Sequence, residues 1–208
     1  MTASDPARIE RAPRKRREIT PEAMRQRALK RIVKNNRVHF LKAKALSDLC
    51  VKPLPGEQYR IITEKQFNAY ALILHLLETE EIERMYLAIY RINEQTVASL
   101  IDFIEAGKIK KATFVISNFF NQTRKPERWA IKLREFCDNN SDCEHVYTHN
   151  HSKVLAVKTT SGSHYVFEGS GNMSDNARIE QYIYENSEEV YLFHKSWMDE
   201  LIEQGGNQ

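Results

Sequence analysis

Two short polar runs contain the residues of this chain best suited to chemistry, His-Ser-Lys at 151–153 and Gly-Ser-Gly-Asn at 169–172. Alternate residues of a strand point to the same side, so we expect His151 and Lys153 to project together. An imidazole beside an ammonium provides one group that attacks phosphorus and one that holds its negative oxygens. Ser170 and Asn172 add hydroxyl and amide donors for those oxygens, on a turn that the glycines permit. Together the two runs predict a phosphoryl-transfer site.

Each run taken alone has a plainer interpretation. A His-x-Lys on a strand is commonly a surface pair, and a Gly-Ser-x-Asn is commonly a polar turn. The prediction depends on their combination. Strand-like residues 153–159, the turn 160–163 and strand-like residues 164–168 read as a hairpin that joins the two runs.

Strands and helices alternate around this hairpin. Apolar runs predict strands at 85–92, 112–117, 145–148 and 181–184, and a short extended piece at 59–62. Helical spacing predicts helices at 63–79, 93–106, 125–139 and 187–204, the last with a core face of Val190, Phe193, Trp197 and Leu201. The sequence therefore predicts an α/β sandwich, with a mixed sheet flanked by helices.

The prolines and glycine of residues 51–56 mark a boundary between a basic extension at 1–56 and a folded domain at 57–208. Residues 1–20 predict a disordered or weakly held arm. A Thr-Pro-Glu start predicts a basic helix over 21–36, continuing irregularly toward residue 49. The extension is thus expected to be partly disordered and partly helical.

Charge is distributed unevenly along the chain. Residues 1–45 hold 14 Lys and Arg against 4 Asp and Glu, a balance of +10, whereas the whole chain has a net charge of +3. Such an arm suits a polyanion, because each cation placed on a phosphate releases a counterion. The alternative is a solvated tail, or an arm packed on its own acidic body. The candidate nucleic-acid contacts are Arg14, Lys15, Arg16, Arg17, Arg27, Lys30 and Arg31.

The cellular compartment of the protein is predicted from the absence of targeting, membrane-spanning and disulfide patterns in the sequence. The first residues have no apolar signal core, and no segment approaches the roughly 18 apolar residues of a membrane span. Cys50, Cys137 and Cys143 form no disulfide framework and no metal-ligand spacing. We therefore expect a soluble cytoplasmic protein without stable membrane association.

With the residues Asn-Ala-Arg-Ile-Glu-Gln at 176–181, the two polar runs resemble the signature of the phospholipase D superfamily. That signature is a His-x-Lys on one strand, a Gly-Ser-x-Asn after the next, and a downstream Glu or Gln. The resemblance implies that His151 is the nucleophile or the acid, and that Lys153 and Asn172 bind phosphate with help from Ser170. It implies that Glu180, or alternatively Glu185, orients the imidazole through its other nitrogen.

One position departs from the family pattern. The usual Asp five residues after the lysine is replaced by Lys158. In the family this Asp supports the fold, so the departure is expected to affect structure more than chemistry.

The chain contains a single His-x-Lys, whereas the implied chemistry needs two histidines. One forms a phosphohistidine, and the other protonates the leaving oxygen and later activates water. The resemblance therefore predicts a two-fold homodimer with one joint site that needs no metal and no other cofactor. A nuclease is favoured over a lipid hydrolase because of the basic arm, with DNA as the first candidate substrate.

Three alternatives accompany this interpretation. His145, His149 and His151 lie close enough in sequence to form a metal site, although they match no recognised ligand spacing. The chain could instead be a dimeric nucleic-acid-binding protein with an idle site. Finally, Phe119 and Phe120 follow a strand and either stack on a base or close the edge of the core.

Overall fold

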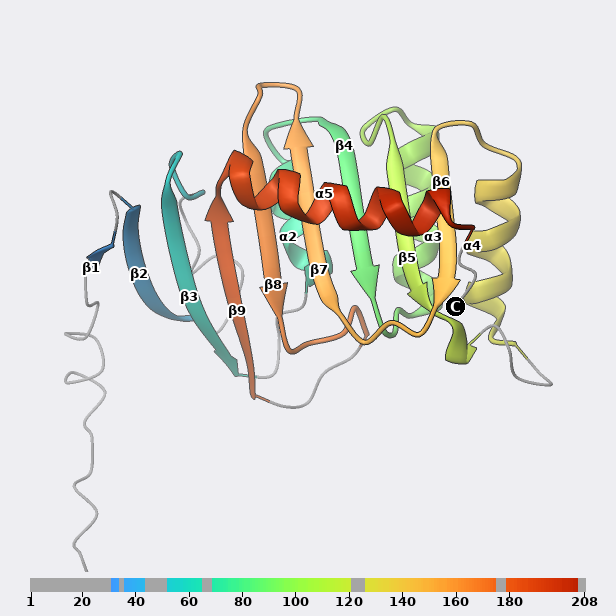
Figure 1. Cartoon of the computed structure of the whole chain (residues 1–208), viewed down its shortest axis with the longest axis horizontal. Helices are drawn as coiled ribbons and strands as arrows, with labels where there is room; N and C mark the ends of the chain where they lie inside the picture. The colour runs from blue at the N-terminus through green and yellow to red at the C-terminus, as the bar shows by residue number, and fades with distance from the viewer. Residues whose placement is uncertain are drawn as a thin grey trace, which may run out of the picture.

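A single mixed β-sheet runs through the molecule in the order β1-β2-β3-β9-β8-β7-β4-β5-β6 (Figure 1). The computed structural model describes residues 31–33, 36–43, 52–64, 69–120, 126–174 and 179–205, without the side chains of 31–43 and 64. The strands are β1 (Arg31–Val33), β2 (Asn36–Ala43), β3 (Glu57–Glu64), β4 (Ile82–Ile89), β5 (Ala112–Ser117), β6 (Cys143–Thr148), β7 (Lys153–Thr159), β8 (His164–Gly169) and β9 (Ile179–Asn186). The helices are α2 (Ala69–Leu77), α3 (Glu94–Glu105), α4 (Arg128–Asp138) and α5 (Glu188–Glu203), with a short 3-10 helix η2 (Asn118–Phe120).

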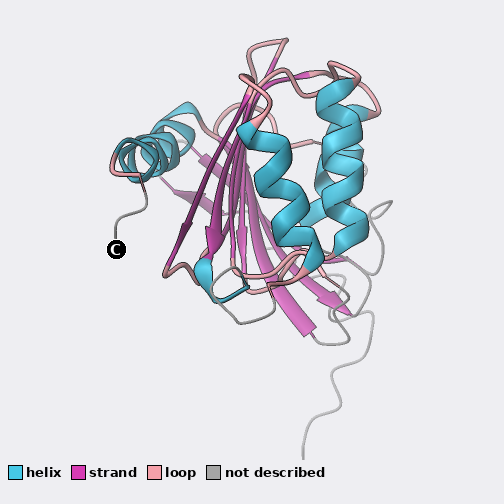
Figure 2. Cartoon of the chain, turned by 90° about the vertical axis from the view of Figure 1, so that its right-hand side faces the viewer, coloured by secondary structure: helices cyan, strands magenta, loops and turns pink. Residues whose placement is uncertain are grey.

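Helices cover both faces of the sheet. Figure 2 shows α2, α3 and α4 on one face and α5 alone on the other. All six residues of β5 are buried, because this strand lies between β4 and β6 with helices on both faces of the sheet. The larger core cluster lies under α2, α3 and α4, and a smaller one lies under α5. The predicted α/β sandwich is confirmed.

Local signals in the sequence account for the ends of two helices. The Asn93 side chain caps α3 by accepting a hydrogen bond from the Thr96 N–H at 2.8 Å. Gly107 follows that helix with φ of 69°, a conformation that glycine adopts without steric cost. The Ser187 side chain caps α5 in the same way as Asn93 caps α3.

The predicted basic helix over 21–36 is wrong for its last residues. Residues 31–33 form β1 and residues 36–43 form β2, which pair with each other antiparallel. β2 in turn runs parallel to β3, so this basic segment extends the main sheet. Pairing with an open sheet edge has overridden the local helical pattern. The predicted helix over 63–79 also begins later, because residues 63 and 64 still belong to β3.

The predicted core face of α5 is confirmed for Val190, Trp197 and Leu201, which pack against the smaller core cluster, and is wrong for Phe193. Tyr191, His194 and Met198 are the buried residues of this helix, whereas Phe193 is 65% exposed. Tyr191 packs edge-on against Tyr86 of β4, with ring centroids 6.0 Å apart. A tyrosine and a hydrogen-bonded histidine therefore share this face with the predicted apolar residues, and both are more deeply buried than a count of apolar residues predicts.

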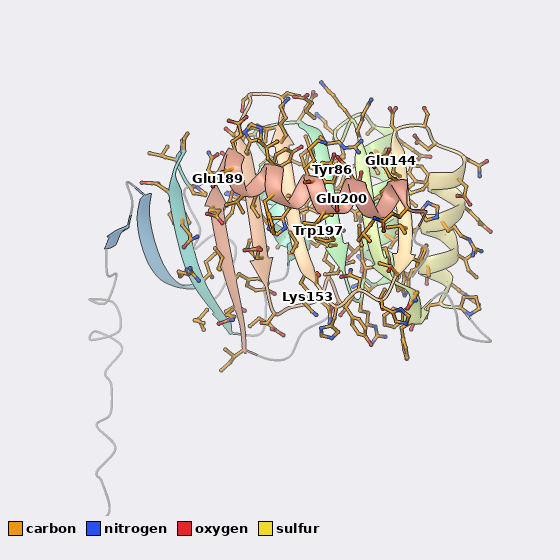
Figure 3. The ribbon with its side chains drawn as sticks, viewed as in Figure 1. Tyr86, Glu144, Lys153, Glu189, Trp197 and Glu200 are labelled. Atoms are coloured by element: carbon orange, nitrogen blue, oxygen red, sulfur yellow. A yellow bond between two sulfur atoms is a disulfide. The ribbon has the colours of Figure 1, made fainter. Side chains whose placement is uncertain are left out.

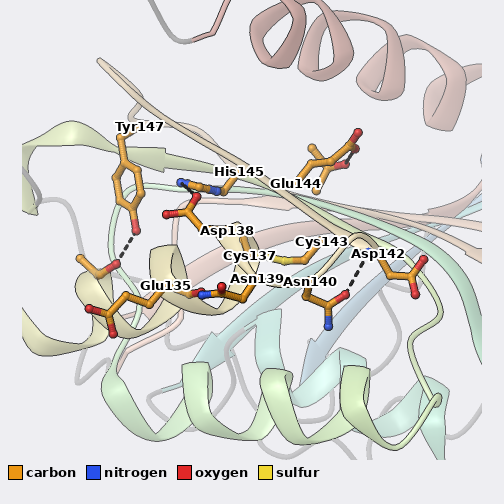
Figure 4. The surroundings of a disulfide bond; sticks show 12 residues. Glu135, Cys137, Asp138, Asn139, Asn140, Asp142, Cys143, Glu144, His145 and Tyr147 are labelled. Atoms are coloured by element: carbon orange, nitrogen blue, oxygen red, sulfur yellow. Dashed lines mark hydrogen bonds and ion pairs between the residues drawn. A yellow bond between two sulfur atoms is a disulfide. The ribbon is translucent and has the colours of Figure 1, made fainter.

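The expectation that the cysteines remain unpaired is also wrong. Cys137 and Cys143 form a disulfide that joins the end of α4 to the start of β6 (Figure 4). Both residues are buried, and their Cα atoms are 4.8 Å apart. The helix-to-strand turn brings together two cysteines that are 6 positions apart in sequence. The compartment predicted from unpaired cysteines loses that support.

Candidate active site

The topology brings the candidate residues together along the edge of the sheet that is formed by strand ends, where β4, β5 and β6 finish. β4, β5 and β6 are parallel, so their carboxyl ends share this edge. Because β7, β8 and β9 are each antiparallel to the preceding neighbour, β7 and β9 begin there and β8 ends there. Figure 3 shows Lys153, the first residue of β7, at this edge and well away from α5. An edge built from several strand ends is a common location for ligand sites in α/β folds.

The histidine and lysine of the first polar run are in direct contact. Lys153 Nζ donates to His151 Nδ1 at 3.1 Å and to the His151 carbonyl oxygen at 2.7 Å. Because an ammonium only donates, the lone pair of Nδ1 is the acceptor in this contact. His151 lies just before β7 rather than on it, so the lysine reaches back along the chain to the ring.

Burial lowers the pKa of Lys153, and the negative charge of Glu180 partly opposes this change. The Lys153 ammonium also lies 5.6 Å from the centre of the Tyr90 ring, where a cation is attracted to the aromatic face. The lysine is thus held between the imidazole, an aromatic ring and a carboxylate. Such a partly desolvated cation interacts strongly with a phosphate.

A buried asparagine positions the loop that carries His151. Asn150 is 8% exposed, and its amide donates to the carbonyl oxygens of Ile89 at 3.3 Å and Val115 at 2.9 Å. Its Oδ1 accepts a hydrogen bond from the Ser152 N–H at 2.8 Å. These bonds tie the loop to the ends of β4 and β5. Sequence analysis missed Asn150, because nothing nearby in sequence marks these two carbonyls as its partners.

The second polar run begins at Gly169, the last residue of the neighbouring strand β8, and continues beyond it. The Ser170 hydroxyl donates to the Glu180 carboxylate and accepts the Gln181 N–H at 3.1 Å. The Asn172 Oδ1 accepts the Arg91 N–H at 3.2 Å, which links this run to the chain after β4. The described hydrogen bond of the Glu180 side chain therefore goes to Ser170, and His151 Nδ1 faces Lys153 instead. Glu185, the alternative to Glu180, points toward Gln58 of β3.

Gly169 is required for a reason other than the expected turn. A Cβ at this position would lie 2.0 Å from Cδ1 of Tyr182 and 2.6 Å from the Gln181 carbonyl oxygen. The absence of a side chain lets β9 approach β8 closely, which brings Glu180 to Ser170. The glycine is therefore needed because a side chain at position 169 would overlap Tyr182 of β9.

A pocket of about 480 Å³ opens beside the histidine and is lined by Tyr90, Ser117, Asn118, Phe119 and residues 149–151. The ring of Tyr90 lies 4.5 Å from that of His151. The two aromatics singled out in the sequence have different environments, because Phe119 is 59% exposed and Phe120 is 6% exposed. Phe120 closes the core edge, whereas Phe119 forms part of the pocket.

The residues of the alternative metal site are not brought together. His145 Nε2 lies 3.8 Å from Asp138, and its ring contacts Tyr147 on β6. Within the described ranges, no three His, Cys, Asp or Glu side chains are placed to share a metal ion. His149, by contrast, lines the same pocket as His151.

Lys158, the departure from the family pattern, lies near the far end of β7. Its Nζ donates to Glu83 of β4 at 2.8 Å. An ion pair between neighbouring strands thus takes the place of the usual acidic residue. At about 3.3 Å per residue, five strand positions separate it from Lys153 by roughly 16 Å.

Most of the predicted nucleic-acid contacts lie outside the described residues. These are Arg14, Lys15, Arg16, Arg17, Arg27 and Lys30. Arg31 is the first residue of β1, of which only the backbone is described. Across the helices that the structure describes, we find none with the length and apolar content of a membrane span.

No protein-family model matches this chain, and no curated protein matches it significantly. Among solved structures, that of a phospholipase D family member, Nuc from Salmonella typhimurium, has 14% sequence identity and a TM-score of 0.50, over 73% of this chain and 97% of that chain. NucT from Helicobacter pylori has 18% identity and a TM-score of 0.49, over 72% of this chain and 98% of that chain. The likeness to Nuc shows a shared fold, which is the phospholipase D-like fold that the sequence predicts.

Proposed function

We propose that this chain, which has the phospholipase D fold, is a phosphodiesterase and specifically a metal-independent nuclease. The observation that carries the proposal is the contact between Lys153 Nζ and His151 Nδ1, at 3.1 Å, on the sheet edge beside an open pocket. A phosphodiester needs a nucleophile and a cation for its negative oxygens, and this pair supplies both. The second polar run adds Ser170 and Asn172 as donors, just after the end of the neighbouring strand β8.

The reaction proceeds through two displacements at phosphorus. An imidazole nitrogen of one His151 attacks, so that a phosphorus–nitrogen bond forms while the bond to the leaving oxygen breaks. The partner subunit's His151 gives a proton to that oxygen. It then takes a proton from water, which attacks phosphorus, breaks the phosphorus–nitrogen bond and releases a phosphate monoester.

Lys153 couples substrate binding to activation of the nucleophile. Its ammonium donates to the Nδ1 lone pair of His151 in the structure. A bound phosphate competes for the same ammonium, because a charged oxygen is the stronger acceptor. Substrate binding therefore releases the imidazole. Glu180, which acts electrostatically on Lys153, is then the acidic group available to orient the ring.

Two subunits are required because each chain contributes one His-x-Lys. A two-fold axis at the sheet edge brings His151, Lys153 and Asn172 of both chains to one phosphate. The balance of +10 on residues 1–45 favours nucleic acid, and DNA first, as the substrate that the basic arm captures.

The experiment that tests this function compares the native chain with His151→Ala on plasmid and on single-stranded DNA, in the presence of EDTA. We expect the native chain to cleave and the variant to lose at least about 10³-fold in rate, because it lacks both the nucleophile and the acid. DNA binding is measured alongside and should persist in the variant. Equal cleavage by both proteins would remove His151 from the site. Binding without cleavage by the native chain would favour the alternative, a DNA-binding protein with an idle site.

A further inference from the structure

The pocket beside His151 has two aromatic walls. The rings of Tyr90 and Phe119 are inclined to each other by 30°, with centroids 6.4 Å apart. Phe120 supports both rings edge-on, at 5.3 Å from Tyr90 and 5.2 Å from Phe119, and is itself packed on Trp129. The exposed Phe119 is therefore held by a buried aromatic base. Flat, apolar surfaces of this kind bind other planar rings.

A polar group on the same pocket lacks a partner. Asn118 is 4% exposed, and its Nδ2 is a buried donor with no hydrogen-bond acceptor among the described residues. Because buried amide donors are nearly always satisfied and Asn118 lines the pocket, an acceptor on a bound ligand would supply the missing partner. Phosphate alone would satisfy the donor but leave the aromatic walls unused. An acyl chain would cover the walls but leave the donor unsatisfied.

We propose that this pocket receives an unpaired nucleobase next to the scissile phosphate, so that the substrate class is single-stranded nucleic acid. This inference rests on the proposed function and names its substrate. A nucleobase has a planar face for Tyr90 and Phe119, and a carbonyl oxygen or ring nitrogen that accepts a hydrogen bond from Asn118. Bases in a duplex are paired and stacked, and they reach such a pocket only after they leave the helix.

Binding of fluorescent oligothymidylate tests the pocket, with an all-abasic strand of equal length and a duplex as the other probes. All proteins carry His151→Asn, so that hydrolysis does not interfere. Phe119→Ala is compared with its parent, with Phe119→Trp, and with Phe193→Ala, which removes an equally exposed phenylalanine on α5. Unchanged thermal midpoints establish that each variant is folded.

We expect Phe119→Ala to weaken oligothymidylate binding about 5- to 150-fold, the range that corresponds to the loss of one base stack. Binding of the abasic strand should not change, Phe119→Trp should restore the thymidylate affinity, and Phe193→Ala should behave as the parent. Asn118→Leu, which removes the donor without adding a charge, should also weaken thymidylate binding only. An equal loss of affinity for the thymidylate and the abasic strand, or no loss for either, would overturn the proposed base pocket. If native protein cleaves no DNA while the thymidylate-specific loss is present, the pocket stands and the nuclease function fails.

Discussion

Lys153 shows how one residue acquires its properties from its surroundings. The sequence predicts a strand lysine two positions after a histidine, but the structure adds partial burial, a tyrosine ring and a nearby carboxylate. Burial lowers the pKa of its ammonium. The lysine therefore loses its charge at a lower pH than a solvent-exposed lysine would.

We expect the lowered pKa of Lys153 to set the alkaline limit of activity. Lys153→Arg keeps its positive charge above pH 12, so the alkaline limb of the pH–rate profile should move to higher pH, although the wider guanidinium lowers the rate at neutral pH. The measurement is kcat for oligonucleotide cleavage across the alkaline range. Lys158→Arg, on the same strand but outside the site, serves as the control and should leave the limb in place. An unmoved limb in Lys153→Arg would assign the alkaline limit to another group.

A second prediction concerns the close packing at Gly169. In Gly169→Ala the new Cβ overlaps the ring of Tyr182, which forces β9 away from β8. We expect a loss of about 1–3 kcal/mol in the free energy of unfolding, together with reduced activity as Glu180 moves. Chemical denaturation measures the first effect. The adjacent Ser170→Ala creates no overlap and loses only the hydrogen bonds of its hydroxyl to Glu180 and Gln181, so it should cost less stability than Gly169→Ala. Native stability of Gly169→Ala would show that β9 can move aside freely.

At the scale of secondary-structure elements, helix α5 stabilises β8, the strand that leads to the second polar run. His194 Nε2 lies 2.9 Å from the Glu168 carboxylate on β8, and Trp197 Nε1 donates to the other ring nitrogen at 3.1 Å. Figure 3 places Trp197 beneath the helix and over the sheet. This pair connects α5 to the residue directly before Gly169. The orientation of β8 thus depends on both faces of the sheet.

The hydrogen bond from His194 lowers the pKa of Glu168, with burial acting in the opposite direction. A carboxyl with a lowered folded-state pKa stabilises the fold above its unfolded pKa, and this contribution is lost as pH falls through the folded value. We therefore expect Glu168→Gln to be less stable than native protein near neutrality, and the difference to shrink below about pH 4.5. Thermal midpoints across this pH range provide the measurement. Glu200→Gln, an exposed position on α5, should show no such convergence, and a constant difference for Glu168→Gln would contradict the linkage.

At the scale of the whole molecule, one chain presents half of the proposed chemistry. His151, the histidine of the one His-x-Lys, is exposed where the parallel strands end, which allows a second copy to complete the site. The acidic body carries this edge, while the basic balance belongs to residues 1–45. Capture of a polyanion and cleavage of its backbone are therefore expected to use different parts of the chain.

Subunit mixing tests the shared site directly. After exchange of equal amounts of native chain and His151→Ala, a joint site should retain about a quarter of the native activity per total chain, because only native–native dimers have two histidines. Independent sites would retain about half. Sedimentation establishes the dimer. As the control, native chain is mixed with Phe193→Ala, which leaves the site unchanged, and this mixture should retain full activity. Retention of half would show that one chain suffices.

The sequence by itself determined the alternation of strands and helices from residue 82 onward and the two polar runs. Both depend on periodicity and on turn residues that lie close together in sequence. The tertiary structure decided the properties that depend on distant residues. Residues 31–43 became strands because a sheet edge was available to them, and Cys137 met Cys143 across a helix-to-strand turn. Tyr90, Asn118 and Asn150 joined His151 because parallel strands end at a common edge, and no local pattern in the sequence records that meeting.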